Sequence, residues 1–328
     1  MTGSGKNILV TGGGGYIGSH AVWHLKAAGY RVVVVDNFSR GHEDVMSTLE
    51  VPYVKGEIND PAVIKKACEL VRPEVVMHFA ALAYVGESVT EPARYYQNNV
   101  VATLGMLEIL RDLNVRRVIF SSTCATYGTP VLMPITEDTP QRPINPYGWS
   151  KLMIEQILKD FETAYGFRSI LFRYFNAAGA LPSGLIGERH DPETHLIPLA
   201  IQSALGGPEL KVFGNDYPTP DGTCLRDYIH VSDLADAHIL GVQHLLNSGT
   251  SEAFNIGTGS GHSVAEVIKA VEDVSGRKVR FSMDARRVGD PPVLVAAADK
   301  IKATLGWQPK YTKLKDIVET AWNWHQKN

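Results

Sequence analysis

Tyr147 and Lys151 form the pair of residues in this chain that is best suited to acid–base chemistry. They follow Asn145-Pro146, which predicts a helix with Asn145 as N-cap and Pro146 at its first position. A separation of four places both side chains on one helix face. A phenol has a pKa of about 10, but a neighbouring ammonium favours the phenolate, which can accept a proton from an alcohol. Thr123, at the expected carboxyl end of a strand, can hydrogen-bond the same substrate oxygen.

A glycine-rich turn near the beginning of the chain supplies a partner for that chemistry. The turn 11–18 follows the apolar run 7–10 and carries glycine at Gly12, Gly15 and Gly18. Glycine tolerates positive φ and, without a Cβ, lets backbone N–H groups and a helix N-terminus approach a pyrophosphate. A tight turn without a ligand has the same spacing, and a Tyr-x-x-x-Lys pair also occurs by chance on exposed helices. The two features together favour a dinucleotide-dependent enzyme.

Asp36 indicates which dinucleotide is bound. It ends the β-branched run 31–35, which is typical of a strand buried in a parallel sheet. A carboxylate at this position suits a free adenosine 2′-hydroxyl and would repel a 2′-phosphate, so we predict NAD as the cofactor. The alternative is a solvated aspartate that opens the turn 36–39.

Strands and helices are expected to alternate along the part of the chain that carries these residues. This alternation predicts an α/β fold, a doubly wound parallel sheet of the Rossmann type. Beyond Gly179 the pattern loosens, which indicates a second, smaller substrate-binding α/β lobe. Asp233 is expected to cap a returning helix, and 253–256 to form a seventh strand. The expected strands are 7–10, 31–35, 52–56, 74–79, 117–122 and 168–173, and the expected helices are 61–72, 91–114 and 146–165. We therefore predict an NAD-binding domain from 1–176 plus about 230–257, and a substrate domain from about 177–229 plus 258–328.

Composition excludes several classes of partner. The chain has 328 residues, 44% of them hydrophobic, and a net charge of −3, which gives no electrostatic footprint for nucleic acid. The three cysteines, Cys68, Cys124 and Cys224, form neither a zinc pattern nor a disulfide framework. We therefore expect no metal site, and we expect the protein to reside in a reducing compartment. No apolar run approaches the ~20 residues of a membrane span, and the first strand leaves no room for a leader. We predict a cytoplasmic protein without a membrane partner.

Longer motifs are more specific than these single features. They are Thr-Gly-Gly-Gly-Gly-Tyr-Ile-Gly-Ser-His (11–20), His-Phe-Ala-Ala (78–81), Val-Gly-Glu-Ser-Val (85–89), Ser-Ser-Thr-Cys-Ala-Thr-Tyr-Gly (121–128), Asn-Pro-Tyr-Gly-Trp-Ser-Lys (145–151), Arg-Tyr-Phe-Asn (173–176), Phe-Gly-Asn-Asp-Tyr (213–217) and Asp-Gly-Thr-Cys-Leu-Arg-Asp-Tyr-Ile-His-Val (221–231). With them the chain resembles the UDP-glucose 4-epimerases, a family of extended short-chain dehydrogenase/reductases, from Asn7 to Trp324.

The resemblance implies a reaction without net redox change. Tyr147 would act as base on the sugar 4-hydroxyl, assisted by Lys151 and Thr123, while C4 gives hydride to tightly held NAD. The 4-keto sugar would rotate in the site and take the hydride back on its other face, which interconverts UDP-galactose and UDP-glucose. The family also implies a homodimer built from helices in the stretches 91–114 and 146–165.

The resemblance further implies two sets of binding residues. Those expected at the cofactor are Gly12, Gly15, Tyr16, Ile17, Gly18, Asp36, Asn37, Glu57, Ile58, Phe79, Ala80, Asn98, Lys151 and Phe175. Those expected at the UDP-sugar are Thr123, Tyr147, Asn176, Leu196, Phe213, Arg226, Arg287 and Asp290. Guanidinium groups are natural donors to a diphosphate, although either arginine would also be ordinary as a solvated surface charge.

Four positions depart from the family pattern. Glu57 replaces the usual Asp near adenine, Ala83 replaces a pyrophosphate-binding Lys of some members, and His195 replaces an Asn. A histidine at position 195 is more often structural than catalytic. Leu294 lies where a bulky tyrosine is associated with exclusion of N-acetylated sugars, which raises the hypothesis of activity on UDP-N-acetylglucosamine.

Three alternatives stay open from the sequence. A UDP-pentose 4-epimerase would use the same machinery to interconvert UDP-xylose and UDP-arabinose. A 4,6-dehydratase is disfavoured because that family has an Asp-Glu pair after the Thr123 position, where this chain has Cys124-Ala125. A non-catalytic NAD-binding protein of the same fold would not need Thr123, Tyr147 and Lys151 together.

Overall fold

The computed structural model describes residues 5–247, 249–287 and 290–327. The chain divides into two compact units, each built from several segments. The first unit comprises the chain up to Gly128 together with 141–173 and 235–254. The second comprises 129–140, 174–234 and the chain from Asn255 on.

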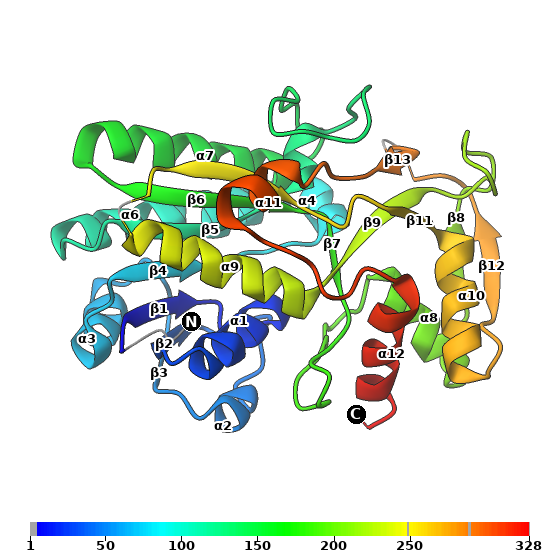
Figure 1. Cartoon of the computed structure of the whole chain (residues 1–328), viewed down its shortest axis with the longest axis horizontal. Helices are drawn as coiled ribbons and strands as arrows, with labels where there is room; N and C mark the ends of the chain where they lie inside the picture. Colours follow the sequence, from blue (N-terminus) through cyan, green and yellow to red (C-terminus); the bar gives the residue numbers. More distant parts are fainter. Residues whose placement is uncertain (1–4, 248, 288–289, 328) are drawn as a thin grey trace. The chain divides into compact units, whose positions relative to one another are not determined.

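A seven-stranded sheet organises the first unit (Figure 1). Its order is β10-β6-β5-β4-β1-β2-β3, and β1 pairs in parallel with β2 and β4, with Leu9 opposite Val33 and Val76. This order reverses direction at β1, which is the mark of the predicted doubly wound Rossmann-type sheet, and that prediction is confirmed. The strands are β1 (Asn7–Thr11), β2 (Arg31–Asp36), β3 (Tyr53–Lys55), β4 (Val75–His78), β5 (Arg117–Thr123), β6 (Arg168–Tyr174) and β10 (Glu252–Ile256).

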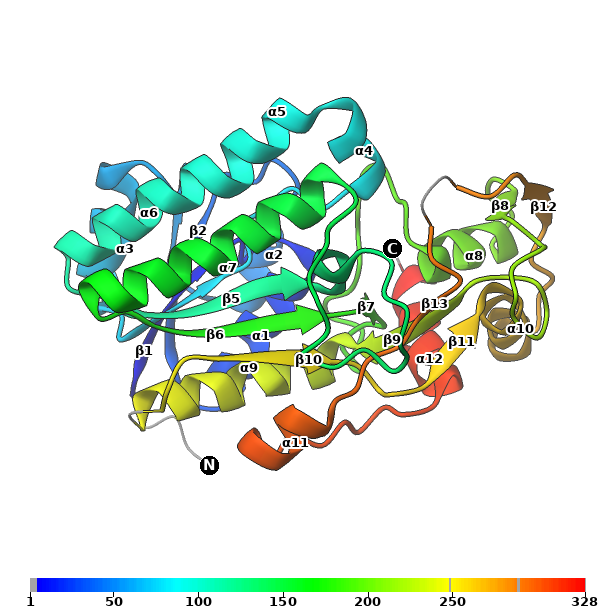
Figure 2. The same cartoon turned by 90° about the horizontal axis from the view of Figure 1, so that it is seen from above.

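Helices cover both faces of this sheet. The helices are α1 (Tyr16–Ala27), α2 (Val45–Leu49), α3 (Pro61–Val71), α4 (Val85–Thr90), α5 (Pro92–Tyr95), the π-helix η1 (Tyr96–Val101), α6 (Ala102–Asp112), the 3-10 helix η2 (Cys124–Tyr127), α7 (Pro146–Tyr165) and α9 (Val231–Leu246). Apolar side chains of α3, α6 and α7 pack with Leu9, Val76 and Phe120 in one core. On the opposite face, Gly241 of α9 packs against Phe172, and α1 lies beside α9 (Figures 1 and 2).

Helix α7, which carries the Tyr-Lys pair, begins and ends at residues suited to those positions. Asn145 is its N-cap and accepts the N–H of Gly148 at 2.8 Å, and Pro146 occupies the first turn. Gly166 ends it in the left-handed conformation, with φ +71°. The helix predicted over 146–165 is confirmed, whereas the single helix predicted over 91–114 is interrupted by η1.

The second unit contains two small sheets and four helices among its described residues. Its strands are β7 (Asn176–Ala178), β8 (Leu210–Phe213), β9 (Leu225–His230), β11 (Gly261–Ser263), β12 (Phe281–Asp284) and β13 (Val293–Leu294), and its helices are α8 (Leu196–Ala204), α10 (Val264–Ser275), α11 (Asp299–Leu305) and α12 (Leu314–His325). Buried residues of α8, α10 and α12 form its core.

Two features of this unit differ from the sequence prediction. The loop 129–140 belongs to it because Ile135 exchanges backbone hydrogen bonds with Val295 and Ala297, both 2.8 Å long. Asp233 is not an N-cap, because α9 begins at Val231. Its carboxylate instead accepts the N–H groups of Lys310 and Tyr311 at 2.9 Å each. Among the described residues, no helix combines the length and apolar character needed to cross a membrane.

Candidate active site

The glycine turn is a cradle in which added side chains would collide with backbone. Gly12 has φ +76°, and a Cβ there would lie 2.4 Å from the backbone nitrogen of Ala80. A Cβ on Gly18 would lie 2.1 Å from the carbonyl oxygen of Gly12. Gly15 is the N-cap of α1 and has no side chain to accept the N–H groups of the first turn. This arrangement fits a pyrophosphate, because a ligand there can approach the backbone of the turn closely and also meets the positive N-terminal end of α1.

Asp36 lies at the end of β2 next to this turn. Its Oδ2 accepts the N–H of Gly14 at 2.8 Å and its Oδ1 accepts the N–H of Phe38 at 2.7 Å. Burial raises the pKa of this carboxyl, and the two backbone hydrogen bonds oppose that effect. Asn37 donates to Glu57 at 3.0 Å, so two more of the predicted cofactor residues are in contact. The set fits the ribose end of a dinucleotide, because a fixed carboxylate follows the strand beside the glycine turn.

The remaining cofactor predictions in the first unit lie at the ends of neighbouring elements. Phe79 and Ala80 follow β4 and donate to the carbonyl of Thr11 at 2.9 and 3.1 Å. Asn98 belongs to η1 and donates to Asn99 at 2.9 Å. Tyr16 and Ile17 begin α1, and Ile58 is buried after β3. Phe175, in the second unit, is buried and donates to the carbonyl of Ile256 at 3.3 Å.

Thr123, Tyr147 and Lys151 are gathered at the end of β5 and the first turns of α7. The Thr123 side chain hydrogen-bonds Tyr147 and thereby lowers the pKa of the phenol. Lys151 is buried and donates from Nζ to the carbonyl of Ser121 at 2.8 Å. Its Nζ lies 5.9 Å from the centre of the Tyr147 ring. One alcohol oxygen can therefore meet both a phenol and a threonine hydroxyl, with an amine nearby.

Burial of the Tyr147 phenol affects its pKa more than the predicted effect of Lys151 does. The Tyr147 ring is partly exposed, yet desolvation of its phenol raises the pKa to about 12. Burial lowers the pKa of Lys151 to about 7, and Glu155 opposes that shift. We expected the Lys151 ammonium to lower the pKa of Tyr147 enough to favour the phenolate. The groups of the chain alone do not produce that effect. A further positive charge beside the phenol would be needed to stabilise the phenolate.

A buried network of hydrogen bonds and an ion pair joins α7 to β6, and the sequence did not predict it. Arg173 of β6 binds Glu155 of α7, with Nη2 2.6 Å and Nε 3.0 Å from its carboxylate oxygens. The arginine also donates to Tyr127 at 2.9 Å and to Gln141 at 3.1 Å. Glu155 lies one helical turn beyond Lys151, and this spacing from the predicted pair was the only available signal. The network fixes the turn of α7 that carries Lys151.

A second missed network supports the loop after β4. Asn99 is fully buried in η1, where it accepts the N–H of Leu82 at 2.8 Å and donates to the carbonyl of Leu82 at 3.0 Å. It also donates to Ser150 of α7 at 3.0 Å. A π-turn is often found at functional sites. Here it places the side chain that ties the loop carrying Ala83 to α7.

Four of the predicted substrate residues form a connected chain in the second unit. The guanidinium of Arg287 lies 4.0 Å from the centre of the Phe213 ring. The carbonyl of Arg287 accepts the N–H of Asp290 at 3.2 Å, and the Asp290 carboxylate forms an ion pair with Arg226. Phe213 thus supports one arginine, and Asp290 orients the other.

The other predicted substrate residues of this unit, and the position Leu294 associated with sugar specificity, lie on nearby elements. Asn176 of β7 donates to the carbonyl of Asp227, next to Arg226 on β9, at 3.1 Å. Leu294 of β13 is in register with Arg226. Leu196 is the first residue of α8 and packs against the core. The structure therefore brings Asn176 and Leu294 to the strand that carries Arg226.

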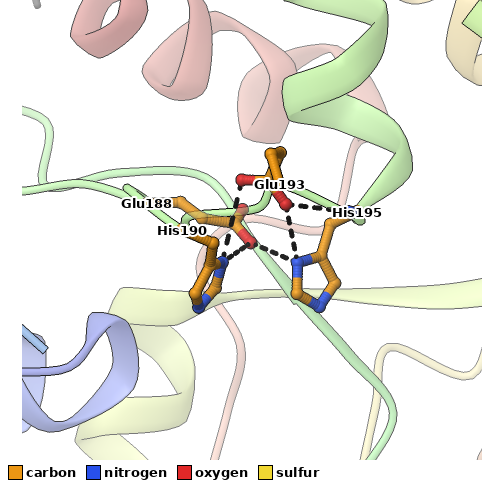
Figure 3. Close-up of side chains that lie close together, drawn as sticks. All are labelled: Glu188, His190, Glu193 and His195. Carbon is orange, nitrogen blue, oxygen red and sulfur yellow. Dashed lines mark hydrogen bonds and ion pairs between the residues drawn. The ribbon is translucent and has the colours of Figure 1, made fainter. Parts of the chain in front are cut away.

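His195 belongs to a cluster that the sequence analysis did not predict (Figure 3). Its Nδ1 lies 2.9 Å from a carboxylate oxygen of Glu188 and 3.0 Å from one of Glu193. Burial lowers the pKa of this histidine, but the two carboxylates outweigh it and raise the pKa to about 10. These contacts hold the His195 ring against the two carboxylates.

Comparisons with known proteins show similarity over nearly the full length of the chain. The model of the family described as NAD dependent epimerase/dehydratase matches residues 8–257. The curated UDP-glucose 4-epimerase of Rhizobium meliloti is 51% identical over 325 residues, which cover 98% of each chain. A solved UDP-glucose 4-epimerase from Brucella ovis in complex with NAD has a TM-score of 0.94 and 49% identity, over 97% of each chain. One from Bifidobacterium longum in complex with NAD⁺ and UDP has a TM-score of 0.93 and 40% identity, over 98% of this chain and 99% of that one.

Proposed function

This chain belongs to the NAD dependent epimerase/dehydratase family, and we propose that it interconverts UDP-glucose and UDP-galactose by inverting C4 of the sugar with NAD as its cofactor. The single observation that carries the proposal is the contact between Thr123 and Tyr147 beside buried Lys151. It lies in the same unit as the glycine cradle and Asp36. The near full-length similarity to UDP-glucose 4-epimerases supports the substrate.

The chain's own residues carry the proton transfer. Tyr147 takes the proton of the sugar 4-hydroxyl, and Thr123 hydrogen-bonds the same oxygen. Bound NAD⁺ supplies the acceptor for the C4 hydride and a positive charge that favours the phenolate. After the sugar has rotated in the site, Tyr147 returns its proton to O4. The tyrosine and the substrate therefore end the cycle with the protons they began with.

Turning the sugar requires a site that holds the nucleotide firmly and the hexose loosely. We assign the firm contacts to Arg226 and Arg287, because guanidinium groups bind phosphate oxygens through several directed hydrogen bonds. Asp290 and Phe213 hold these two side chains. Asn176 and Leu196 are proposed as further contacts to the UDP-sugar.

The test uses the purified protein with UDP-galactose and no added cofactor, and measures UDP-glucose. We expect conversion by the wild type and a loss of about 10²- to 10⁴-fold in Tyr147→Phe. The far-UV spectrum and bound NAD of the variant provide the control for folding. Absence of conversion by the wild type, even with NAD supplied, would refute the proposal, and UDP-xylose would be assayed next.

Leu294 favours a second substrate, UDP-N-acetylglucosamine. It is in register with Arg226, one of the proposed diphosphate ligands, and it is smaller than the tyrosine associated with exclusion of N-acetylated sugars. We expect wild-type turnover of that sugar to fall in Leu294→Tyr while UDP-galactose turnover persists. No turnover of the N-acetylated sugar by the wild type would remove this second function.

We also propose a cytoplasmic homodimer. Apolar side chains are exposed on two contacting parts of the first unit, Val101 and Leu104 on η1 and α6, and Trp149 and Met153 on α7. Exposed apolar side chains on adjacent helices are typical of subunit interfaces. Light scattering of the wild type should give twice the mass of the chain, 35.9 kDa. Leu104→Asp should shift it toward the monomer, and a monomeric wild type would contradict the proposal.

A further inference from the structure

Four side chains in the segment before α8 converge on one point (Figure 3). They are Glu188, His190, Glu193 and His195, and we call them the Glu–His cluster. One nitrogen or oxygen atom of each lies within 4.8 Å of the corresponding atoms of the others. All four belong to the second unit and are distinct from the residues assigned above to proton transfer and to cofactor binding.

The separations in the cluster match those of ligands around one small metal ion. Glu188 Oε1 lies 3.1 Å from Nδ1 of His190 and 2.9 Å from Nδ1 of His195. Glu193 lies 3.7 Å from His190 and 3.0 Å from His195, measured between carboxylate oxygen and Nδ1. Metal–ligand bonds of about 2.0–2.2 Å at tetrahedral angles put neighbouring ligand atoms roughly 3.4 Å apart.

Glu188 provides an independent sign that something is to be bound here. Its side chain is 4% exposed and points into the cluster. Its Oε1 is ion-paired with Nδ1 of His190 and Nδ1 of His195. Within the described ranges, no donor is directed at it in normal hydrogen-bond geometry. A buried carboxylate oxygen is normally satisfied by directed donors. A metal ion could be coordinated by this oxygen together with the two nitrogens.

Surrounding groups hold the backbone of Glu188 and the carboxylate of Glu193 in place. The carbonyl of Glu188 accepts the indole N–H of Trp324, on α12, at 3.1 Å. Glu193 Oε1 accepts the N–H groups of Thr194 and His195 at 2.7 and 2.8 Å, while its Oε2 is the oxygen nearest His190. Outer contacts of this kind orient ligands before the metal arrives. His195 is 46% exposed, which leaves a route for an ion from solvent.

We propose that the Glu–His cluster binds one divalent transition-metal ion, with Zn²⁺ as the best match. Two imidazole nitrogens and two carboxylate oxygens form a donor set that suits Zn²⁺ and related ions, and two carboxylates balance a charge of +2. Four protein ligands make the site closed and structural. The bound ion joins residue 188, anchored to α12, to residue 195, so it fixes the segment that leads into α8 and Leu196.

Metal binding is measured on the untagged full-length protein after dialysis against EDTA and then metal-free buffer. Titration with ZnCl₂ should show one ion per chain, and CoCl₂ should give the intense visible absorption of tetrahedral Co²⁺. Zn²⁺ should also raise the thermal midpoint, because it binds the folded chain only. Absence of stoichiometric binding of either ion would overturn the proposal.

Single substitutions of ligands identify the site. His190→Ala, Glu193→Gln and His195→Asn should each weaken Zn²⁺ binding at least about tenfold and abolish the Co²⁺ band. The matched control is His262→Gln, which removes a histidine that faces one glutamate, Glu266, at 3.7 Å. It should bind like the wild type. Circular dichroism of the metal-free variants establishes that they are folded, and folded ligand variants that bind Zn²⁺ normally would refute the assignment.

Discussion

Arg173 on β6 and Glu155 on α7 form a buried ion pair, with a shortest contact of 2.6 Å and side chains 8% and 5% exposed. The pair joins the helix of Tyr147 and Lys151 to the strand beside β5. Removing one partner of such a pair leaves an uncompensated charge that is largely buried. Its contribution should therefore be measurable as a change in the free energy of unfolding.

We predict that Glu155→Gln lowers the free energy of unfolding by about 3–5 kcal/mol. The measurement is urea denaturation at neutral pH with saturating NAD. The matched control is Lys269→Ala, which breaks an exposed i,i+4 pair with Asp273 on α10 and should change the same quantity by less than about 0.5 kcal/mol. Equal effects of the two substitutions would contradict the importance of the buried pair.

Gly12→Ala should remove bound NAD. The new Cβ would lie 2.4 Å from the nitrogen of Ala80, in backbone that cannot move without opening the cradle. Gly276→Ala is the control, because Gly276 also has positive φ, +67°, but open space where the Cβ would go. In both variants the free energy of unfolding should fall by about 1–2 kcal/mol, because alanine is strained in the left-handed conformation. Only Gly12→Ala should lose NAD, as measured by ultraviolet absorbance of the nucleotide released on denaturation.

Arg287→Lys should raise the KM for UDP-galactose about tenfold or more with a smaller change in kcat. Lysine keeps the charge but loses the planar group that stacks on Phe213 and can donate two hydrogen bonds to one phosphate. Arg277→Lys is the control, since Arg277 also lies over an aromatic ring, that of Trp322, at 5.9 Å. If both variants retain the wild-type KM, Arg287 does not bind the diphosphate.

His78 should make the stability of the protein depend on pH below neutrality. It is buried between Thr11 and Thr103, at 2.7 and 2.8 Å, and burial lowers its pKa from 6.5 to about 3. Between these values the unfolded chain binds a proton that the folded chain does not. The free energy of unfolding should therefore fall as the pH drops from about 6.5 toward 3, by up to about 1.4 kcal/mol per pH unit from this group.

Urea denaturation between pH 7.5 and 4.5 checks this expectation. His78→Gln should be less stable than the wild type at neutral pH but should lose less stability on acidification. His244→Gln, at a partly exposed histidine on α9, should follow the wild-type dependence. Parallel curves for His78→Gln and the wild type would show that His78 does not contribute.

Sequence patterns were sufficient to predict the local elements and the type of fold. The pair Asn145-Pro146 defined the start of α7, because capping and the fixed φ of proline act over a few residues. The apolar runs of β1, β2, β4, β5 and β6 alternate with helical stretches, and that alternation was enough to predict a doubly wound sheet. The motifs between residues 11 and 231 indicated the family, because each combines several chemically specific residues at a fixed spacing.

The interactions between residues distant in the sequence could be identified only from the folded chain. The pKa of Tyr147 depends on its burial and on its contact with Thr123 of another element, so a lysine one turn away could not reveal the direction of the shift. The pairing of Arg173 with Glu155 joins a strand to a helix, and that of Arg226 with Asp290 spans 64 residues. The Glu–His cluster lies in an irregular segment, where no periodicity relates spacing to direction. Contacts of this kind follow from the path of the backbone, which sequence patterns specify only within single elements.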